Sequence, residues 1–208
     1  VSLRDQALGF TDTISGGDGV DTIFGDAVAM TGQSRGAKDT LLGDAGGDIL
    51  FGDAFSMSDS TVAGDDTLQG GTGNDLLYGD AFQAEGDAQG GNDNLFGEDG
   101  NDILFGDFFT AFGNAAGGDD VLDGGTGNDQ LWGDFGTNTG TGIGGDDTFV
   151  FGQNSGLDTI FDFEVGFDEL DFTGFGGNPG DVVITDIDAD GDGVDDLDVD
   201  LDGTAADV

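Results

Sequence analysis

The sequence of 208 residues predicts an all-β solenoid with one turn per 27 residues, because three features repeat at that interval without slippage. Gly-Asp pairs begin at Gly25, Gly52, Gly79, Gly106 and Gly133. One aspartate series comprises Asp21, Asp48, Asp75, Asp102 and Asp129, and a second comprises Asp39, Asp66, Asp93, Asp120 and Asp147. Drift in any copy would break the alignment of stacked units, so the constant interval indicates stacking.

Each turn is expected to begin with a glycine-rich loop that leads into a short strand. The best-formed copies, residues 16–24, 70–78 and 124–132, follow the pattern G-G-x-G-x-D-x-U-x, in which U is a large apolar residue. Glycine accepts the positive φ angles that turn carbonyl groups inward, where a side chain would clash. The x-U-x segment that follows is expected to be a minimal strand with its central side chain pointing inward.

A second strand type follows after a connection of about fifteen residues. Its pattern is G-x-D-x-U-x, found at residues 37–42, 64–69, 91–96, 118–123 and 145–150, with Ala37 in place of the first glycine. A partial earlier copy contains Asp12. We therefore expect each turn to consist of a short loop, a strand, a long loop and a second strand.

The long connection opens with the Gly-Asp pair and continues with apolar residues. The aspartates of these pairs are Asp26, Asp53, Asp80, Asp107 and Asp134. The apolar residues Val28, Phe55, Phe82, Phe108 or Phe109, and Phe135 are expected to form a ladder. We interpret the ladder as a small satellite core beneath the long loops. An exposed aromatic binding surface is the alternative.

The charge of the chain excludes several classes of partner. Its formal net charge is −42, from 45 acidic residues against Arg4, Arg35 and Lys38. Such a charge would disrupt a compact state by self-repulsion unless cations bind. It argues against nucleic-acid binding, which needs a basic patch, and against docking on anionic membranes. No apolar run approaches the length of a membrane span, so membrane insertion is not expected.

The residue types also limit the chemistry. The chain has no cysteine and no histidine, which excludes disulfides, thiolate metal sites and histidine-dependent catalytic triads. Catalysis would fall to paired carboxylates, as in glycosidases. The repeat already accounts for every prominent aspartate, so we expect that the protein is not an enzyme. Carboxylate and carbonyl oxygens remain as the available ligands, and these hard ligands select calcium.

The nonapeptide resembles the repeat of the RTX (repeats-in-toxin) calcium-binding family over most of the chain. The resemblance implies a parallel β-roll, with several calcium ions held between the loops of adjacent turns, and type I secretion. In the familiar β-roll, two nonapeptides form an 18-residue turn, which would place identical segments of this chain on alternate faces. We expect the 27-residue turn instead. Asp44 and Glu98, which replace the second glycine of two loops, are interpreted as facing solvent, with an added ligand role as the alternative.

The register ends at Gly156, so we divide the chain into a solenoid of residues 1–155 and a C-terminal β segment of residues 156–208. Residues 157–172 are expected to form a strand, a turn at Gly166 and another strand. Residues 188–193 match the start of an EF-hand loop, but Val199 stands where the bidentate glutamate would be. The flanking segments alternate with period two, which predicts strands and therefore a calcium-stabilised β-connection.

The candidate calcium ligands are therefore aspartates from the repeats and from the C-terminal loop. They are Asp12, Asp21, Asp26, Asp39, Asp48, Asp53, Asp66, Asp75, Asp80, Asp93, Asp102, Asp107, Asp120, Asp129, Asp134, Asp147, Asp188, Asp190, Asp192 and Asp196. The first series is expected to line one edge of the solenoid. The second series is expected to line the opposite edge and to share ions with the Gly-Asp aspartates.

Two functions are compatible with these features. The first is a secreted, extracellular calcium-binding solenoid that serves as fibre, surface-layer or matrix material and folds on calcium binding outside the cell. The second is a C-terminal folding and secretion module of a larger RTX hydrolase or adhesin. Head-to-tail self-association would accompany the first, because a solenoid exposes unpaired strand edges at its terminal turns.

Overall fold

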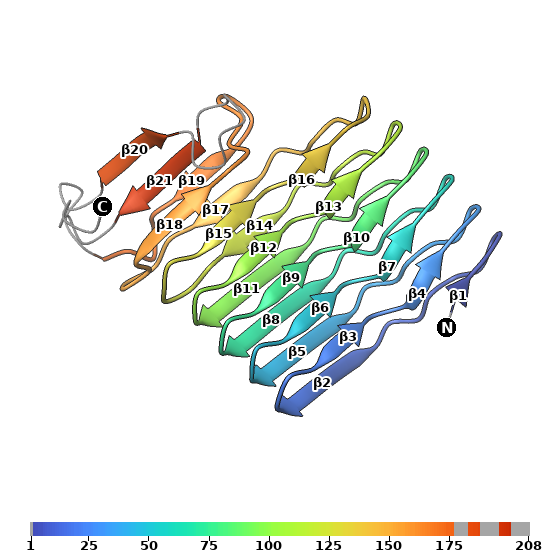
Figure 1. The fold of residues 1–208 in the computed structure, drawn as a ribbon, viewed down its shortest axis with the longest axis horizontal. Helices are drawn as coiled ribbons and strands as arrows, with labels where there is room; N and C mark the ends of the chain where they lie inside the picture. Colours follow the sequence, from blue (N-terminus) through green and yellow to red (C-terminus); the bar gives the residue numbers. More distant parts are fainter. Residues whose placement is uncertain (1, 177–182, 188–195, 201–208) are drawn as a thin grey trace.

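The computed structural model describes residues 2–176, 183–187 and 196–200. Every regular element among them is a strand, and this part of the chain has no helix that could span a membrane. The strands stack into three sheets, and each full turn contributes one strand to each sheet (Figure 1). We call the sheets A, B and C; they contain six, seven and eight strands, respectively.

The three sheets have the following strand orders and bounds. Sheet A contains, in order, β1 (Ser2–Leu3), β4 (Ala27–Met30), β7 (Ala54–Met57), β10 (Ala81–Ala84), β13 (Phe108–Ala111) and β16 (Phe135–Asn138). Sheet B contains β2 (Thr13–Asp18), β5 (Thr40–Ala45), β8 (Thr67–Thr72), β11 (Asn94–Asp99), β14 (Val121–Asp123), β17 (Thr148–Val150) and β19 (Glu169–Asp171). Sheet C contains β3 (Thr22–Phe24), β6 (Ile49–Phe51), β9 (Leu76–Tyr78), β12 (Ile103–Phe105), β15 (Gln130–Trp132), β18 (Leu157–Ile160), β21 (Asp196–Asp200) and β20 (Val183–Ile187).

The register confirms one turn per 27 residues. Leu41 lies opposite Leu68 in sheet B, and Leu50 lies opposite Leu77 in sheet C, both in parallel pairs. The same interval holds in sheet A, where Ala54 lies opposite Ala81. An 18-residue turn would have placed alternate copies on opposite faces, so that alternative is excluded.

Sheets B and C enclose the main core, because the central apolar residue of every strand pattern faces the other sheet. Leu41, Leu68, Leu95, Leu122 and Phe149 come from sheet B, and Ile23, Leu50, Leu77, Leu104, Leu131 and Ile160 come from sheet C. All are buried. The inward position of the U residue in the sequence pattern is thereby confirmed for both strand types.

The long connection was expected to be a loop, but it contains the third strand of each turn, in sheet A. Stacked, near-identical segments one strand spacing apart can pair their backbone N–H and C=O groups, which would otherwise be left without partners. Alanine and methionine side chains of these strands, such as Ala54 and Met57, pack against Ala63, Ala88 and Ala115 of the segment that returns to sheet B. A second, smaller core results.

The predicted ladder of apolar residues in this connection divides into two columns. Phe108 and Phe135 stand in register with Ala81 and face the smaller core, where Phe108 is fully buried. Val28, Phe55, Phe82 and Phe109 form the neighbouring column, which faces outward. Because adjacent residues of a strand point to opposite sides, a shift of one residue separates the satellite core from an exposed row.

The parallel stacking continues beyond Gly156 at altered spacing. Strand β18 pairs with β15, and β19, which follows the turn at Gly166, where φ is +96°, pairs with β17. Strands β20 and β21 then add to β18 in antiparallel orientation. The expected strands on both sides of the EF-hand-like sequence are therefore confirmed. The sequence itself, residues 188–193, lies outside the described residues.

Candidate metal sites

The first aspartate series forms a continuous ladder at the tight turns between sheets B and C. The backbone N–H of Asp48 donates to Oδ1 of Asp75 at 2.7 Å, and the N–H of Asp75 donates to Oδ1 of Asp102 at 2.7 Å. Asp21 and Asp129 continue the ladder in both directions. One oxygen of each carboxylate thus fixes the backbone of the preceding turn, which explains why an aspartate recurs at this position.

The other carboxylate oxygen of this ladder has no hydrogen-bond partner. Oδ2 of Asp48, Asp75, Asp102 and Asp129 is buried and unpaired, and each of these residues is at most 2% exposed. A buried anionic oxygen without a partner is costly unless a cation or a proton neutralises it. The ladder therefore leaves a row of oxygens that favours a bound cation.

Glycine leaves room for these oxygens to converge with carbonyl groups. An ideal Cβ atom built on Gly70 would lie 2.6 Å from Oδ2 of Asp75 and 2.8 Å from the carbonyl oxygen of Gly97 in the next turn. Real Cβ atoms are not found at such distances, so any side chain at Gly70 would displace this pair of oxygens. Gly73, with φ of +139°, adopts the left-handed conformation that the loop requires.

Two loops carry an acidic residue at the left-handed position, as the sequence indicated. Asp44 and Glu98 have φ of +72° and +73°, and both side chains are exposed. The carboxylate of Asp44 accepts hydrogen bonds from the Gly17 N–H, at 3.1 Å, and from the Ser15 hydroxyl. The solvent-facing interpretation is therefore confirmed, and the left-handed backbone is strained at both positions.

We expect the substitution Glu98→Gly to stabilise the calcium-loaded protein by about 0.5–1 kcal/mol. Relief of the left-handed strain, about 1–2 kcal/mol, exceeds the added entropy of the unfolded chain, about 0.5–1 kcal/mol. The urea midpoint in saturating calcium measures the change. Glu85→Gly is the matched control, because Glu85 is exposed and lacks a positive φ, and it should destabilise the protein. Equal effects of the two substitutions would contradict the strain argument.

The second aspartate series forms a similar ladder where the returning segment enters sheet B. The N–H of Asp66 donates to Oδ1 of Asp93 at 2.6 Å, and the N–H of Asp93 donates to Oδ1 of Asp120 at 2.7 Å. Asp12, Asp39 and Asp147 extend it. From Asp39 to Asp147, Oδ2 of each member is again buried without a hydrogen-bond partner.

The Gly-Asp aspartates reach the same edge from the bend between sheets C and A. An oxygen of Asp53 accepts the Gly64 N–H at 2.9 Å, and an oxygen of Asp107 accepts the Gly118 N–H at 2.9 Å. Asp26, Asp80 and Asp134 make the equivalent bond. The remaining oxygens of Asp53, Asp80 and Asp107 are buried and unpaired. The second series and the Gly-Asp series therefore lie together, as expected.

These carboxylates resist ionisation when no cation is present. Burial first, and the neighbouring carboxylates second, raise the pKa of Asp66 to about 8 and that of Asp147 to about 9. The same causes raise the pKa of Asp134 to about 8 and the pKa of Asp53 well above its usual value. On the first edge, burial raises the pKa of Asp102 to about 7. Each series therefore needs protons or cations to persist in the folded state.

Three aspartates that the sequence reasoning missed close these series at the last turn. The N–H of Asp129 donates to Oδ1 of Asp158 at 2.9 Å, and the N–H of Asp147 donates to Oδ1 of Asp168 at 3.0 Å. Asp162 accepts the N–H of Asp134 at 2.9 Å. Their distances in sequence from Asp129, Asp134 and Asp147 differ from 27 residues, so a search at the fixed interval does not find them. Residues 158–161 nevertheless repeat the Asp-Thr-Ile-Phe of residues 21–24, a signal that could have found the first of them.

The candidate sites depend on the backbone as much as on side chains. Within the described part of the chain, no group of three or more acidic, histidine or cysteine side chains is arranged to hold a metal. Carbonyl oxygens of the glycine loops, such as that of Gly97 near Oδ2 of Asp75, are the further oxygen ligands that lie close to these carboxylates. Asp188, Asp190 and Asp192 fall outside the described residues, and Asp196 begins β21.

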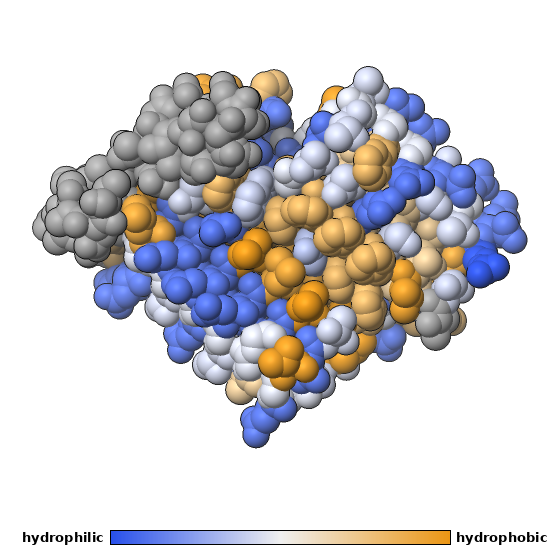
Figure 2. Space-filling model, in the orientation of Figure 1, coloured by the Kyte–Doolittle hydropathy of each residue, from blue (hydrophilic) through white to orange (hydrophobic). Residues whose placement is uncertain are grey.

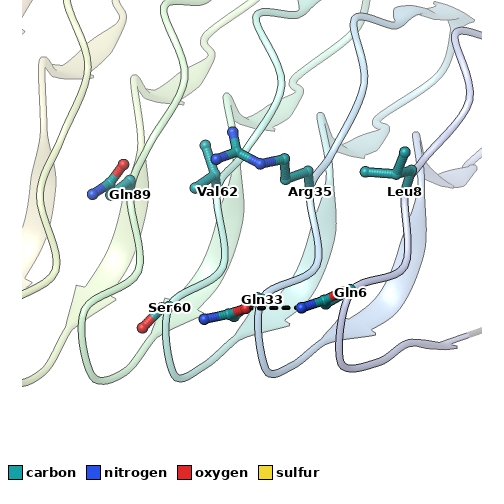
Figure 3. A pocket seen from close by; sticks show the side chains of 7 residues that line it. All are labelled: Gln6, Leu8, Gln33, Arg35, Ser60, Val62 and Gln89. Carbon is teal, nitrogen blue, oxygen red and sulfur yellow. Dashed lines mark hydrogen bonds between the residues drawn. The ribbon is translucent and has the colours of Figure 1, made fainter.

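One cavity lies away from the aspartate ladders, and another adjoins them at the last turn. A cavity of about 480 Å³ runs along the returning segments, and its only charged lining residue is Arg35 (Figure 3). Gln6 and Gln33, hydrogen-bonded at 3.3 Å, also line it. A cavity of about 560 Å³ at the last turn includes Asp134 and Asp162 in its lining. The first cavity lacks carboxylates and does not suit a cation, whereas the second continues the acidic edge.

The family comparison agrees with this geometry. The model of the RTX calcium-binding nonapeptide repeat matches residues 6–27, 36–56, 60–81, 87–109 and 114–149, more than half of the chain. The chain belongs to this family. It is therefore a β-solenoid of RTX calcium-binding repeats. No curated protein gave a match to the chain.

The residues of this RTX solenoid fit calcium in three respects. Unpaired oxygens of buried carboxylates recur in each series, and glycine loops bring carbonyl oxygens next to them. Oxygen is the donor that calcium prefers, and flexible carbonyl-rich loops suit its coordination better than the strict octahedron of magnesium. The repeat produces this geometry from the turn of Asp39 to that of Asp147.

Proposed function

We propose that this RTX solenoid is a secreted, non-enzymatic protein that folds when calcium binds outside the cell and then serves as structural or assembly material. The observation that carries the proposal is the pairing state of the buried aspartates. Among the described residues, twelve aspartates keep a buried carboxylate oxygen without a hydrogen-bond partner. Their other oxygens accept backbone N–H groups, from the adjacent turn in the Asp21 and Asp39 series and from the same turn in the Gly-Asp series. The same side chains that build the fold therefore also require a cation.

Named residues would hold the ions. At the first edge these are Asp21, Asp48, Asp75, Asp102 and Asp129 with carbonyls of the glycine loops, and at the second edge the Asp39 series with the Gly-Asp series. Bound calcium supplies the positive charge that lets these carboxylates remain ionised in a buried setting. Because the sites exist only in the folded chain, binding free energy becomes folding free energy.

An extracellular location suits this coupling. Calcium modules of extracellular proteins bind at roughly 10⁻⁴–10⁻³ M, so the chain would stay unfolded at cytosolic calcium and fold after export. Type I secretion, which the family resemblance implies, delivers unfolded chains and therefore agrees with the same order of events. The location remains part of the proposal.

End-to-end association would give the solenoid its assembly role. Exposed apolar side chains lie at both terminal turns: Leu8, Phe10 and Val20 at the first, and Val165 and Phe167 at the last. Within the described part of the chain, strands β1, β2 and β3 each pair with one other strand, so their outer edges could pair with the strands of a second copy. A head-to-tail contact between such ends grows an open filament when its rotation does not close.

Sedimentation velocity tests this function. In EGTA we expect a slowly sedimenting, expanded monomer, because ionised carboxylates repel one another. In millimolar calcium we expect a compact species whose size grows with protein concentration. A chain that is equally compact in EGTA and calcium would contradict the proposal.

A compact monomer in calcium at all concentrations would favour the alternative function, a folding and secretion module of a larger RTX protein. One observation supports that alternative. Strands β21 and β20 join sheet C in antiparallel orientation after the last parallel strand, which interrupts the parallel stack at that end.

A further inference from the structure

An uncharged aromatic face lies on the outside of sheets A and C. Its first column is a continuous stack of rings on the side of sheet C that faces away from the main core: Phe24, Phe51, Tyr78, Phe105, Trp132 and Phe161. Phe51, Tyr78 and Phe105 are only 3–4% exposed, because their neighbours in the stack and the two columns described next pack against them, so those two columns form most of the exposed surface. Ring centroids of successive members are 4.1–5.2 Å apart. The second column contains Val28, Phe55, Phe82 and Phe109 of sheet A, and a third contains Ile49, Leu76 and Ile103 of sheet C. We call these three columns the aromatic face.

The columns form one surface, because they touch across the Gly-Asp bend. Phe51 meets Phe55 edge to face at a centroid distance of 6.0 Å, and Tyr78 meets Phe82 in the same way. Figure 2 shows apolar residues gathered in the middle of this side of the molecule, over β6, β9 and β12 and the neighbouring strands of sheet A. Val28 and Phe55 remain 47% and 42% exposed.

The aromatic face lacks charge in a chain whose net charge is −42. Residues 22–30, 49–57, 76–84, 103–111 and 130–138 contain no lysine, arginine or glutamate, and their only aspartates are those of the Gly-Asp pairs. Asp53, Asp80 and Asp107 are fully buried and point away from this surface to the returning segment. An apolar patch of this size, bordered by acidic turns, is typical of an interaction site.

The chemistry of the surface limits the partner. A basic partner would be drawn to the acidic turns and not to this face. Carbohydrates stack on ring faces, but the rings of the first column cover one another's faces, and Phe51, Tyr78 and Phe105 are buried. The aromatic face therefore suits a partner whose contact surface is uncharged, apolar and similar in shape. The chain itself carries such a surface, and contact there keeps the carboxylates of two copies apart.

The footprint of the aromatic face is large enough for a contact between two copies of the chain. Five strands about 4.8 Å apart span about 24 Å along the axis, and the bent nine-residue segments span about 25 Å across it. The footprint of the face is therefore about 600 Å² on each copy, or about 1,200 Å² for two copies, which is at the lower end of the range of specific interfaces. Equal spacing of the columns on both copies permits an isologous contact, in which the same rows interlock.

We propose that the aromatic face binds the aromatic face of a second copy, so that calcium-loaded solenoids pair side by side. The proposal rests on the calcium-folded assembly role described above, but it concerns the flank of the solenoid and not its ends. In a filament, such pairing would join two end-to-end rows laterally.

The test compares charge introduced on and off the aromatic face. Phe55→Asp and Val28→Asp place carboxylates on it, and Phe112→Asp is the matched control, because Phe112 is 39% exposed and lies outside the three columns. Circular dichroism and the calcium midpoint of each variant come first. They show whether the variant folds and whether the neighbouring Gly-Asp aspartates still function, and a wild-type chain that fails to fold in calcium contradicts the proposed function instead.

Sedimentation velocity in millimolar calcium then measures pairing. We expect the wild type and Phe112→Asp to form dimers or laterally paired species, and the two face variants to need at least tenfold higher concentration. Trp132, the single tryptophan, lies on the aromatic face, so its emission should shift to shorter wavelength with concentration in the wild type and in Phe112→Asp, but not in the two face variants at the same concentrations. Folded face variants that pair like the wild type would overturn the proposal. So would a wild type whose Trp132 emission responds only to phosphatidylcholine vesicles, which would assign the face to a lipid surface.

Discussion

Calcium-free protein is expected to be unfolded at pH 8 and β-rich at pH 4.5. The folded state raises the pKa of Asp66 to about 8, of Asp80 to about 7 and of Asp147 to about 9, whereas in the unfolded chain these carboxyls titrate near 4. The folded chain therefore binds more protons between these limits, and its stability rises as the pH falls from about 9 to about 4.

Calcium reverses the direction of this pH dependence. Calcium ligands must be ionised, so acid competes with calcium for the same oxygens and should raise the calcium concentration needed for folding. Far-UV circular dichroism of protein stripped of calcium on a chelating resin, at low protein concentration because the pI is about 4.1, checks the first direction. A chain that folds in calcium at pH 8 but stays unfolded without it at pH 4.5 would show that carboxylate charge is not what opposes folding.

The substitution Asp93→Asn is expected to have opposite effects with and without calcium. The asparagine side chain keeps an oxygen at the Oδ1 position, which accepts the N–H of Asp66 at 2.6 Å, so the ladder between turns survives. The amide nitrogen replaces Oδ2, the buried oxygen without a partner, which lies beside the Gly106 carbonyl. Burial, with the charges of Asp80, Asp120 and Asp66, raises the pKa of Asp93 well above its usual value, and the neutral amide removes this cost.

Without calcium, the acid-induced folding of Asp93→Asn should therefore have its midpoint at higher pH than in the wild type. With calcium, the loss of an ionised ligand should raise the calcium midpoint about tenfold or more, equivalent to about 1.4 kcal/mol or more. Circular dichroism titrations with acid and with calcium measure both. The control is Asp65→Asn, at an exposed carboxylate next to the ladder, which should leave both midpoints nearly unchanged. If Asp93→Asn left both midpoints unchanged, Asp93 would serve only as a backbone acceptor, which would contradict the prediction.

The sequence was sufficient to predict the 27-residue period and the alignment of the aspartate series. A constant interval fixes which residues stand above one another, so the edge shared by Asp48 and Asp75 and the inward position of Leu50 followed without further information. The solvent-facing side chains of Asp44 and Glu98 followed from the loop pattern in the same way.

Features that depend on strand register within the long connection were harder to predict from the sequence. The strands of sheet A were missed because Ala54–Met57 and its copies have no clean alternation, and their pairing arises from stacking rather than from local preference. The choice between Phe108 and Phe109 as ladder members depended on a one-residue shift that only the pairing of Ala81 with Phe108 resolves. The aromatic column that ends at Phe161 was missed because its members occupy a position treated only as the end of a strand.

The closing aspartates were missed for a different reason. Asp158, Asp162 and Asp168 take the ladder positions of the last turn, but changes in loop length alter their distance in sequence from Asp129, Asp134 and Asp147. A fixed period cannot detect copies at a changed spacing, whereas the hydrogen bond that each copy must accept does identify them.

The most direct test of the coupling between calcium and folding is a far-UV circular dichroism titration of calcium-stripped protein at pH 8. The buried, unpaired carboxylate oxygens of the aspartate series predict a disordered spectrum at the start and a cooperative change to a β-rich spectrum at about 10⁻⁴–10⁻³ M calcium, reversed by EGTA. A β-rich spectrum before calcium is added, unchanged at millimolar calcium, would contradict the account.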